Sequence, residues 1–450
     1  MNDEAIALDL LRQADLAPLP QRRAAVDSRA SQPHGQRPLR ILLPSYRSHP
    51  HTGGQGVYIR HVSRALADLG HQVDVISGPP YPELDQRIGL IKLPSLDLFA
   101  HPKPLHGLPR ERRGNLTDWI EYLSHNSGGF AEPYTFGRRL VGYLRANAGA
   151  YDIIHDNQTL CTGLLRLQRL GPPVISTIHH PITKDREHAI SAQETAFFRF
   201  LVWRWHLFLN MQKRVARRLD NIIAISHSTY RDLIGEFGLR PQQMQVILQG
   251  IDSDGFRPMP EIQRLPNRLM ATASADVPLK GLIYLVEAYA SLLTEFPDLE
   301  LVVVGKLRDG PTGRLLRKLG IKDRVRFVSD LDTGAINRLY AEATIAVSPS
   351  VYEGFGFPAG EAMAAGVPLV ATTGGALPEV VGPDGVLVRP GDSAQLAAAI
   401  AGLLRDPERR AAMGHRGRAR MLREFQWSRT AAQLSAYYYQ KIDDHAHRRS

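Results

Sequence analysis

Residues 348–382 read SPSVYEGFGFPAGEAMAAGVPLVATTGGALPEVVG. Ser348 ends an apolar run typical of a buried strand, and Pro358 suits the first turn of a helix, so the stretch predicts a strand, a loop and a helix. The loop glycines let backbone amides approach a ligand, and the helix N-terminus attracts an anion such as a diphosphate. Glu353 in the loop and Glu361 in the first turn offer carboxylates to hydroxyl groups. The stretch therefore predicts a site for a diphosphate that joins two polyols.

Short apolar strands alternate with helices on both sides of this stretch. The strand-like segments are ILLPSY, QVDVIS, YDIIHD, PVISTIHH and NIIAIS in the first half of the chain, and LELVVVGK, RVRFVS, ATIAVSPS and VPLVATT in the second half. Such alternation predicts parallel sheets that are covered by helices on both faces. The fold class is therefore α/β, with two doubly wound domains.

The turn-forming sequence GIDSDGFRPMP separates the two series of strands. We expect one domain over residues 38–256 and the other over residues 257–425. Residues 1–37 are rich in arginine, proline and polar side chains, which predicts a mobile N-terminal extension. The aromatic, helical stretch 426–450 suits a C-terminal helix that packs across the domain junction.

The composition is that of a globular protein. Of 450 residues, 43% are hydrophobic and 22% are charged, which excludes wholesale disorder. Glycines and prolines interrupt the longest uncharged stretch, so no transmembrane helix is predicted, and the N-terminus does not resemble a secretory signal. The single cysteine, Cys161, excludes an internal disulfide and indicates the cytoplasm. The net charge of +10 favours anionic partners.

The stretch 348–382 resembles the Glu-x7-Glu motif of retaining glycosyltransferases of the two-domain GT-B architecture, in family 4 (group 1). Glu353 and Glu361 match the motif, and Ala364, Gly366 and Pro368 match the turn that follows it. The resemblance extends from about residue 39 to residue 438. It implies two Rossmann-like domains that face each other across a cleft, an N-terminal one for the acceptor and a C-terminal one for the nucleotide sugar.

The resemblance also implies roles for the residues of this motif. Glu353 is expected to contact the donor sugar, and Glu361 is expected to hold the nucleotide ribose. The intervening loop is expected to meet the diphosphate and sugar through Gly354, Phe355, Gly356 and Phe357. The alternative, that both acids only stabilise a helix N-terminus by about 0.3–1 kcal/mol, explains one glutamate but not the loop between them.

Lys280, in the sequence PLKG before a predicted helix, is the second element of the predicted donor site. A lysine there neutralises the charge that develops on a diphosphate leaving group, although a solvated helix-start lysine is the alternative. The family has an arginine five residues earlier, where this chain has Ala275. Lys306 and Arg308 are candidates to replace it. Gly305 matches the strand-end glycine of the family, and Arg326 is a further candidate on the strand expected beside the nucleotide base.

The N-terminal half offers a glycine-rich loop and a histidine. Gly53 and Gly54 resemble the family loop that faces the donor diphosphate and the acceptor, although the loop alternatively only makes room for a helix. It lacks the G-x-G-x-x-G fingerprint, so a nicotinamide cofactor is not expected. His179 matches the histidine that the family places near the donor sugar, with a structural histidine as the alternative. His179 and His180 have no companion ligand at helical spacing, so no metal site is expected.

Residues 197–220 combine many aromatic and aliphatic side chains with six basic ones. Two interpretations are open: an amphipathic helix in an anionic membrane surface, or a core helix with a solvated basic edge.

The sequence as a whole favours a retaining, metal-independent glycosyltransferase. We expect transfer of a hexose from a UDP- or GDP-linked sugar to a glycan or lipid-linked acceptor, in the cytoplasm or at the inner face of the membrane. No cofactor and no nucleic-acid partner are expected. The alternatives are a non-catalytic sugar-nucleotide-binding protein or partner subunit, and a GT-B epimerase or phosphorylase.

Overall fold

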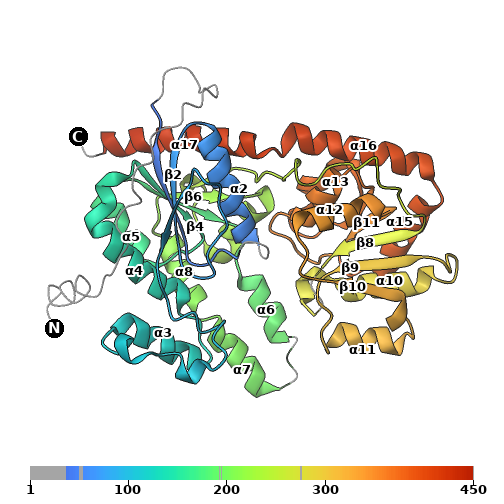
Figure 1. Ribbon diagram of the computed structural model, residues 1–450, viewed down its shortest axis with the longest axis horizontal. Helices are drawn as coiled ribbons and strands as arrows, with labels where there is room; N and C mark the ends of the chain where they lie inside the picture. The colour runs from blue at the N-terminus through green and yellow to red at the C-terminus, as the bar shows by residue number, and fades with distance from the viewer. Residues whose placement is uncertain (1–36, 50–53, 192, 194, 274–275, 449–450) are drawn as a thin grey trace. The chain divides into compact units, whose positions relative to one another are not determined.

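The computed structural model describes residues 37–448 except 50–53, 192, 194 and 274–275 (Figure 1). The extension predicted at the N-terminus, up to residue 36, and the positions of Gly53 and Ala275 lie outside the described residues. The chain forms two compact units. Unit 1 comprises the residues up to Ile225, Tyr230–Ile247 and those from Thr430, and unit 2 comprises Ser226–Thr229 and Leu248–Arg429.

Unit 1 is built on a parallel sheet. Its strands are β1 (Arg40–Ser45), β2 (Gln72–Ser77), β3 (Gly89–Lys92), β4 (Ile153–Asn157), β5 (Val174–Ile178), β6 (Asn221–Ala224) and β7 (Met244–Val246). Their order in the sheet is β3-β2-β1-β4-β5-β6-β7. The helices are α2 (Gly54–Asp68), α3 (Leu116–Asn126), α4 (Glu132–Asn147), α5 (Thr162–Leu170), α6 (Thr183–Ser191), α7 (Ala196–Trp205) and α8 (Phe208–Ala216). Two further helices, α9 (His227–Asp232) and α17 (Trp427–His447), begin in unit 2 and end in unit 1.

Helices α4, α5 and α8 form one buried core with the strands of unit 1. Leu140 of α4 and Leu164 of α5 are buried in the same cluster as Ile154 of β4. α2 buries Tyr58 and Val62, two residues of the face that its sequence predicts.

Unit 2 repeats this architecture. Its strands are β8 (Arg268–Thr272), β9 (Glu300–Val304), β10 (Val325–Val328), β11 (Ile345–Ser348), β12 (Leu369–Thr372) and β13 (Val386–Val388). Their order is β10-β9-β8-β11-β12-β13, and all pairs are parallel. The helices are α10 (Leu282–Leu292), α11 (Pro311–Lys318), α12 (Thr333–Glu342), α13 (Phe357–Ala364), α14 (Leu377–Val381), α15 (Ser393–Leu404) and α16 (Pro407–Glu424). α10 and α15 pack in one core cluster with β8, β9 and β11.

These two parallel sheets confirm the predicted α/β class. The bounds of the units differ from the predicted domains, because residues 248–256 belong to unit 2. The cause is backbone pairing: the amide of Ile251 donates to Phe425 at 2.7 Å, and Ile251 forms a parallel bridge with Gln426. The predicted C-terminal helix corresponds to α17, which begins in unit 2 and from Thr430 belongs to unit 1.

Residues 197–220 do not form one helix, and neither interpretation of them as a single helix is correct. α7 ends at Trp205 and α8 begins at Phe208. Between them, the ring Nδ1 of His206 donates a hydrogen bond to the carbonyl oxygen of Val202 at 2.7 Å. α8 buries Phe208 and Leu209 and is a core helix, whereas α7 has no buried residue. The two halves of the segment therefore have different surroundings.

None of the helices in the described part of the chain has both the length and the apolar character that a bilayer-spanning segment needs.

The crossing of α4 and α5 yields a prediction on stability. A Cβ added at Gly163 of α5 would lie 2.6 Å from the carbonyl oxygen of Gly137 in α4. We expect Gly163→Ala to lower the free energy of unfolding by about 1–3 kcal/mol, because the two helix backbones must separate. Urea unfolding followed by circular dichroism measures this.

Gly142 of α4 provides the matched control, because a Cβ there meets no atom within 4 Å. Gly142→Ala should raise the free energy of unfolding by about 0.5–1 kcal/mol through the lower entropy of the unfolded chain. Equal effects at both positions would contradict the close packing of α4 on α5.

Candidate functional site

Each sheet has a point at which its strand order reverses. In unit 2 the reversal lies between β8 and β11, and in unit 1 it lies between β1 and β4. Open parallel sheets bind ligands outside the carboxyl ends of their strands at such points. Lys280 and Glu353 follow β8 and β11, and Gly54 and His179 follow β1 and β5. These four predicted residues therefore lie after the carboxyl ends of strands in the two sheets.

Lys280 and Glu353 form an ion pair at the reversal point of unit 2. The ammonium nitrogen Nζ of Lys280 lies 2.8 Å from Oε1 of Glu353, and the hydroxyl of Ser350 donates to the same oxygen at 2.7 Å. The Lys280 side chain is 32% exposed and that of Glu353 is 11% exposed. The ammonium of Lys280 and the carboxylate of Glu353 are thus paired, and both remain partly accessible to solvent.

The loops that carry this pair touch each other through glycines. Gly281 has φ of 62°, and a Cβ there would overlap the carbonyl oxygen of Pro349. Gly375 has φ of 63°, and a Cβ there would overlap the carbonyl oxygen of Glu353. The amide of Ala376 donates to that carbonyl at 2.8 Å. Only glycine combines these backbone angles with this closeness, so Gly281 and Gly375 fix the position of Glu353.

In the loop between Glu353 and α13, Phe355 and Gly356 are buried and Gly354 is partly exposed. Phe355 is buried, with its ring 5.3 Å from that of Phe357 and 6.0 Å from that of Phe425, so its side chain anchors the loop in the core. The carbonyl of Gly354 accepts hydrogen bonds from Ser226 at 2.9 Å and Thr229 at 3.2 Å. Gly356 is the N-cap of α13. The helix N-terminus that the sequence predicts is present beside Glu353.

Glu361 is the fifth residue of α13, just past the first turn that the sequence predicts for it. It is partly buried, and burial together with the nearby charge of Asp252 raises its pKa to about 8, against the opposing charge of Lys280. The protonated carboxyl therefore predominates at neutral pH in the ligand-free protein, and it can both donate and accept a hydrogen bond.

The other candidate residues of unit 2 follow β9 or lie in β10. Gly305 follows β9, and its amide donates to the carbonyl of Val328 at 2.7 Å. Lys306 and Arg308 follow it with exposed side chains. Arg326 is the second residue of β10, the outer strand of the sheet, and is exposed. The structure does not bring Arg326 to the reversal point, because two strands of the sheet, β9 and β8, follow β10 before β11.

His179 is buried at the end of β5 in unit 1. Its ring Nε2 donates to Oδ1 of Asn157 at 2.7 Å, and its amide donates to Oε1 of Gln158 at 2.6 Å. The ring of Tyr58 packs edge-on at 5.0 Å. Burial lowers the pKa of His179 to about 3, so the imidazole is neutral at physiological pH. It can take part in hydrogen bonds but cannot carry a positive charge there.

The glycine-rich loop of unit 1 contributes to packing. Gly54 is the first residue of α2 and is exposed. A Cβ at Gly56 would overlap the carbonyl oxygen of His49, so this glycine is required for α2 to lie against the loop that follows β1. For Gly56, the alternative that the loop only makes room for a helix therefore applies.

Sequence reasoning missed several residues that hold the site together. They are Ser350, Gly374, Gly375 and Glu379, whose carboxylate accepts the amides of His227 and Ser228 at 2.7 and 2.6 Å. The two consecutive glycines after β12, Gly374 and Gly375, are the feature of the sequence that could have identified this turn. Within the described residues, no three His, Cys, Asp or Glu side chains are placed to share a metal ion.

Comparison with known proteins defines the family. The profile of the glycosyl transferases group 1 matches residues 262–420, and that of glycosyltransferase family 4 matches residues 52–254. The MMP α-(1→4)-mannosyltransferase of Mycolicibacterium hassiacum is 46% identical over 410 residues, which cover 90% of this chain and 98% of that protein.

Two solved structures have the same fold. Sucrose-phosphate synthase from Thermosynechococcus elongatus superposes with a TM-score of 0.68 at 26% identity, over 90% of this chain and 100% of that one. Anabaena HepE in complex with UDP-glucose superposes with a TM-score of 0.65 at 18% identity, over 89% and 100% of the two chains. The chain belongs to the group 1 glycosyltransferases of family 4 and has their GT-B fold.

The raised pKa of Glu361 predicts a pH dependence of stability. The folded protein keeps the Glu361 proton up to about pH 8, whereas the unfolded chain releases it near the ordinary value of 4.5. Because the folded state binds more protons in this window, the contribution of Glu361 to the free energy of unfolding falls as the pH rises from about 5 to 8. Glu361→Gln should therefore lose less stability over this range than the parent protein.

Urea unfolding at a series of pH values measures the difference, with the exposed Glu408→Gln as a matched control. Parallel pH profiles of the parent and Glu361→Gln would contradict the raised pKa.

Proposed function

We propose that the protein is a retaining, metal-independent hexosyltransferase that transfers mannose from a nucleotide diphosphate sugar to a glycan acceptor in an α-(1→4) linkage. The observation that carries the proposal is the pair of Lys280 and Glu353, held at the reversal point of unit 2 beside the N-terminus of α13. The 46% identity to an MMP α-(1→4)-mannosyltransferase over 90% of the chain supports the sugar and the linkage. A UDP-glucose complex of the fold neighbour HepE supports a nucleotide sugar as donor.

Lys280 supplies positive charge to the departing diphosphate. In the reaction the bond between the anomeric carbon and the diphosphate oxygen breaks, and the acceptor oxygen bonds to the same face of that carbon. The acceptor proton passes to the leaving diphosphate. Negative charge develops on that group, and a fixed ammonium beside it lowers the barrier more than it strengthens ground-state binding.

Glu353 and Glu361 are proposed to hold the two ends of the donor. Glu353, held by Ser350 and by the backbone of the Gly374-Gly375 turn, orients the hexose hydroxyls. Glu361, protonated at neutral pH, both donates to and accepts from the ribose hydroxyls. The loop residues Gly356 and Phe357 offer the amides at the start of α13 to the diphosphate.

His179 is proposed to act in unit 1 as a neutral hydrogen-bonding group toward the transferred sugar. The hydrogen bonds to Asn157 and Gln158 fix the orientation of its ring and backbone. A positively charged imidazole plays no part in this proposal, because burial keeps the ring neutral.

A thermal-shift series with GDP-mannose, UDP-glucose and ADP-glucose, followed by product analysis, tests the function. One donor should raise the melting temperature at saturation, since a ligand that binds only the folded state stabilises it. With an α-(1→4)-mannoside acceptor, that donor should yield an extended product whose proton NMR spectrum has an α-anomeric signal. Donor binding without transfer to any glycan, or a β-linked product, would overturn the proposal.

Replacing Lys280 tests the role of its charge. Lys280→Ala should lower kcat by about 10²- to 10³-fold while the KM for the donor changes far less, because the charge acts mainly in the transition state. The exposed Lys322→Ala is the matched control and should keep parental kinetics. A chelator should leave the turnover of the parent protein unchanged. Equal losses in kcat and donor binding would contradict this role for Lys280.

A further inference from the structure

Helix α7 exposes aromatic side chains along its whole length. None of its ten residues is buried. Phe197 is 64% exposed, and Phe198, Phe200 and Trp203 are 54%, 54% and 46% exposed. Neither the fold nor the proposed reaction uses these side chains. Large apolar side chains that gather on one exposed surface mark a site of contact with something outside the protein.

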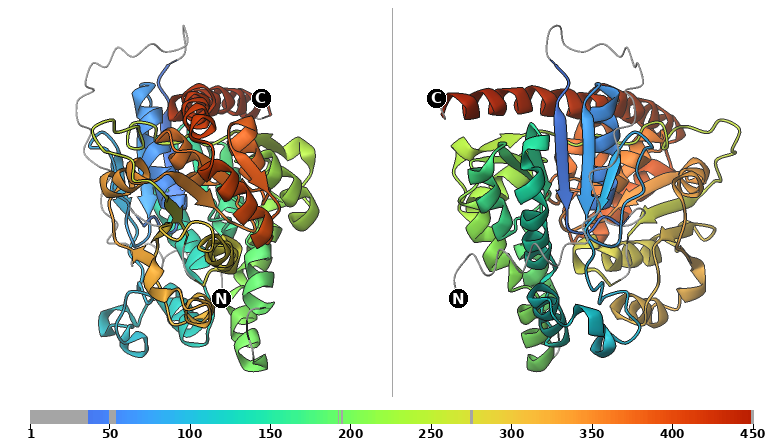
Figure 2. Two further views of the ribbon diagram at one scale, coloured as in Figure 1. Left: turned by 90° about the vertical axis from the view of Figure 1, so that its right-hand side faces the viewer. Right: turned by 60° about the vertical axis from the view of Figure 1, so that its left-hand side comes forward.

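A second segment of unit 1 extends this surface. Of the twelve exposed large hydrophobic residues in the described part of the chain, eight lie in two segments, residues 99–123 and 197–203. We call these eight the apolar end of unit 1: Phe99, Leu105, Leu116, Leu123, Phe197, Phe198, Phe200 and Trp203. Helices α3 and α7 lie at the same end of the unit in all views (Figures 1 and 2).

Direct contacts join the two segments. The guanidinium of Arg204 donates to the hydroxyl of Ser127 at 3.0 Å, just after α3. The ring of Trp205 stacks on that of Phe130 at 4.9 Å, and Phe99 packs edge-on against Phe130 at 5.6 Å. The buried Phe130 therefore anchors both segments, and the apolar end is one surface of a folded unit.

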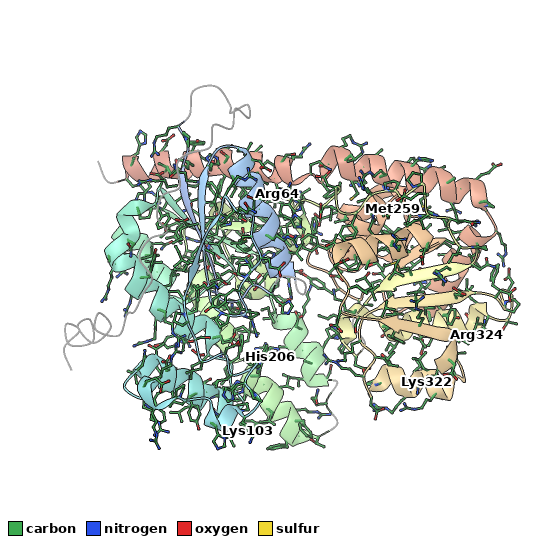
Figure 3. The ribbon with its side chains drawn as sticks, viewed as in Figure 1. Arg64, Lys103, His206, Met259, Lys322 and Arg324 are labelled. Atoms are coloured by element: carbon green, nitrogen blue, oxygen red, sulfur yellow. The ribbon has the colours of Figure 1, made fainter. Side chains whose placement is uncertain are left out.

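The charges around the apolar end are mostly positive. The acids of the two segments are Glu111, Asp118 and Glu121, and Arg139 binds the last two in the interior at 2.5 and 2.7 Å. Only Glu111 is exposed among these acids. The cations of the two segments that are not buried are Lys103, Arg110, Arg112, Arg113 and Arg199, and Arg204 follows directly after the second segment. Lys103 lies at this end of the unit, beyond the His206 junction (Figure 3).

We propose that the apolar end of unit 1 docks on the surface of an anionic lipid bilayer. Phenylalanine, tryptophan and leucine side chains enter the headgroup region, while the surrounding lysine and arginines contact lipid phosphates. A second copy of the chain fits this surface less well, because it would bring the same cations together. Of the two interpretations of residues 197–220, membrane contact thus applies to α7 alone, joined by the segment around α3.

Vesicle flotation of the full chain tests the proposal. The protein should float with phosphatidylcholine vesicles that contain about 30% phosphatidylglycerol but not with pure phosphatidylcholine, and less at high salt, because charge contributes to binding. A variant with Phe197→Ser, Phe200→Ser and Trp203→Ser should bind at least about tenfold more weakly, since it removes inserted side chains. α7 buries none of these residues, so the variant should keep the parental melting temperature.

Two further variants complete the design. Replacement of Lys103, Arg110 and Arg113 by glutamine should weaken binding to anionic vesicles by about tenfold or more. Leu319→Ser with Leu422→Ser removes two exposed leucines of unit 2 and should leave flotation unchanged. The donor-dependent thermal shift should be the same in all of these variants, which separates this proposal from the transferase proposal.

Three results would overturn membrane docking. They are the absence of flotation with anionic vesicles, undiminished flotation of the triple α7 variant, and a dimer in sedimentation velocity that the triple variant dissociates. The last result would identify a second copy of the chain as the occupant of the surface.

Discussion

The close approach of two loops in unit 2 is the constraint on which the candidate site depends. The loop after β8 turns at Gly281 directly against the carbonyl of Pro349, and this contact brings Lys280 within 2.8 Å of Glu353. A larger residue at Gly281 would separate the loops and with them the two charges. Pairing in the sheet fixes the distance between β8 and β11, but the loops that follow these strands can touch only because residue 281 is a glycine. The chemistry of the site therefore rests on a backbone contact.

Burial sets the charge state of several ionisable groups in the two units. In unit 2 the partly buried Glu361 has a raised pKa and holds a proton at neutral pH, whereas Glu353 is paired with a cation. In unit 1 His155 and His179 both have pKa values lowered to about 3 by burial, and both are hydrogen-bonded. Burial thus keeps Glu361, His155 and His179 uncharged at neutral pH, whereas Lys280 and Glu353 form an ion pair.

The sequence predicted the α/β class and the strands β1, β5 and β11, because alternating apolar segments and turn formers are local signals. It did not predict β3, β7, β8 and β13. β3, β7 and β13 have three or four residues each and few buried ones, and the apolar run of β8 between Arg268 and Thr272 is three residues long, so these patterns are too short to recognise. The Glu-x7-Glu motif located Glu353 and Glu361, since both lie on one continuous loop and helix. The positions of Gly375 and Ser350 relative to Glu353 depend on how separate loops fold together, and no local pattern records that. The break between α7 and α8 was missed for a similar reason: α8 is fixed by packing on the core, whereas α7 packs on little of it.

The proposed donor site lies at the reversal point of unit 2, against Lys280 and the loop that runs from Glu353 into α13. Amide hydrogen exchange of the full chain, with and without the nucleotide sugar that raises its melting temperature, tests this most directly. Exchange in residues 277–282 and 349–361 should become slower when the donor is bound. Unchanged exchange in both segments, with protection elsewhere in the chain, would contradict it.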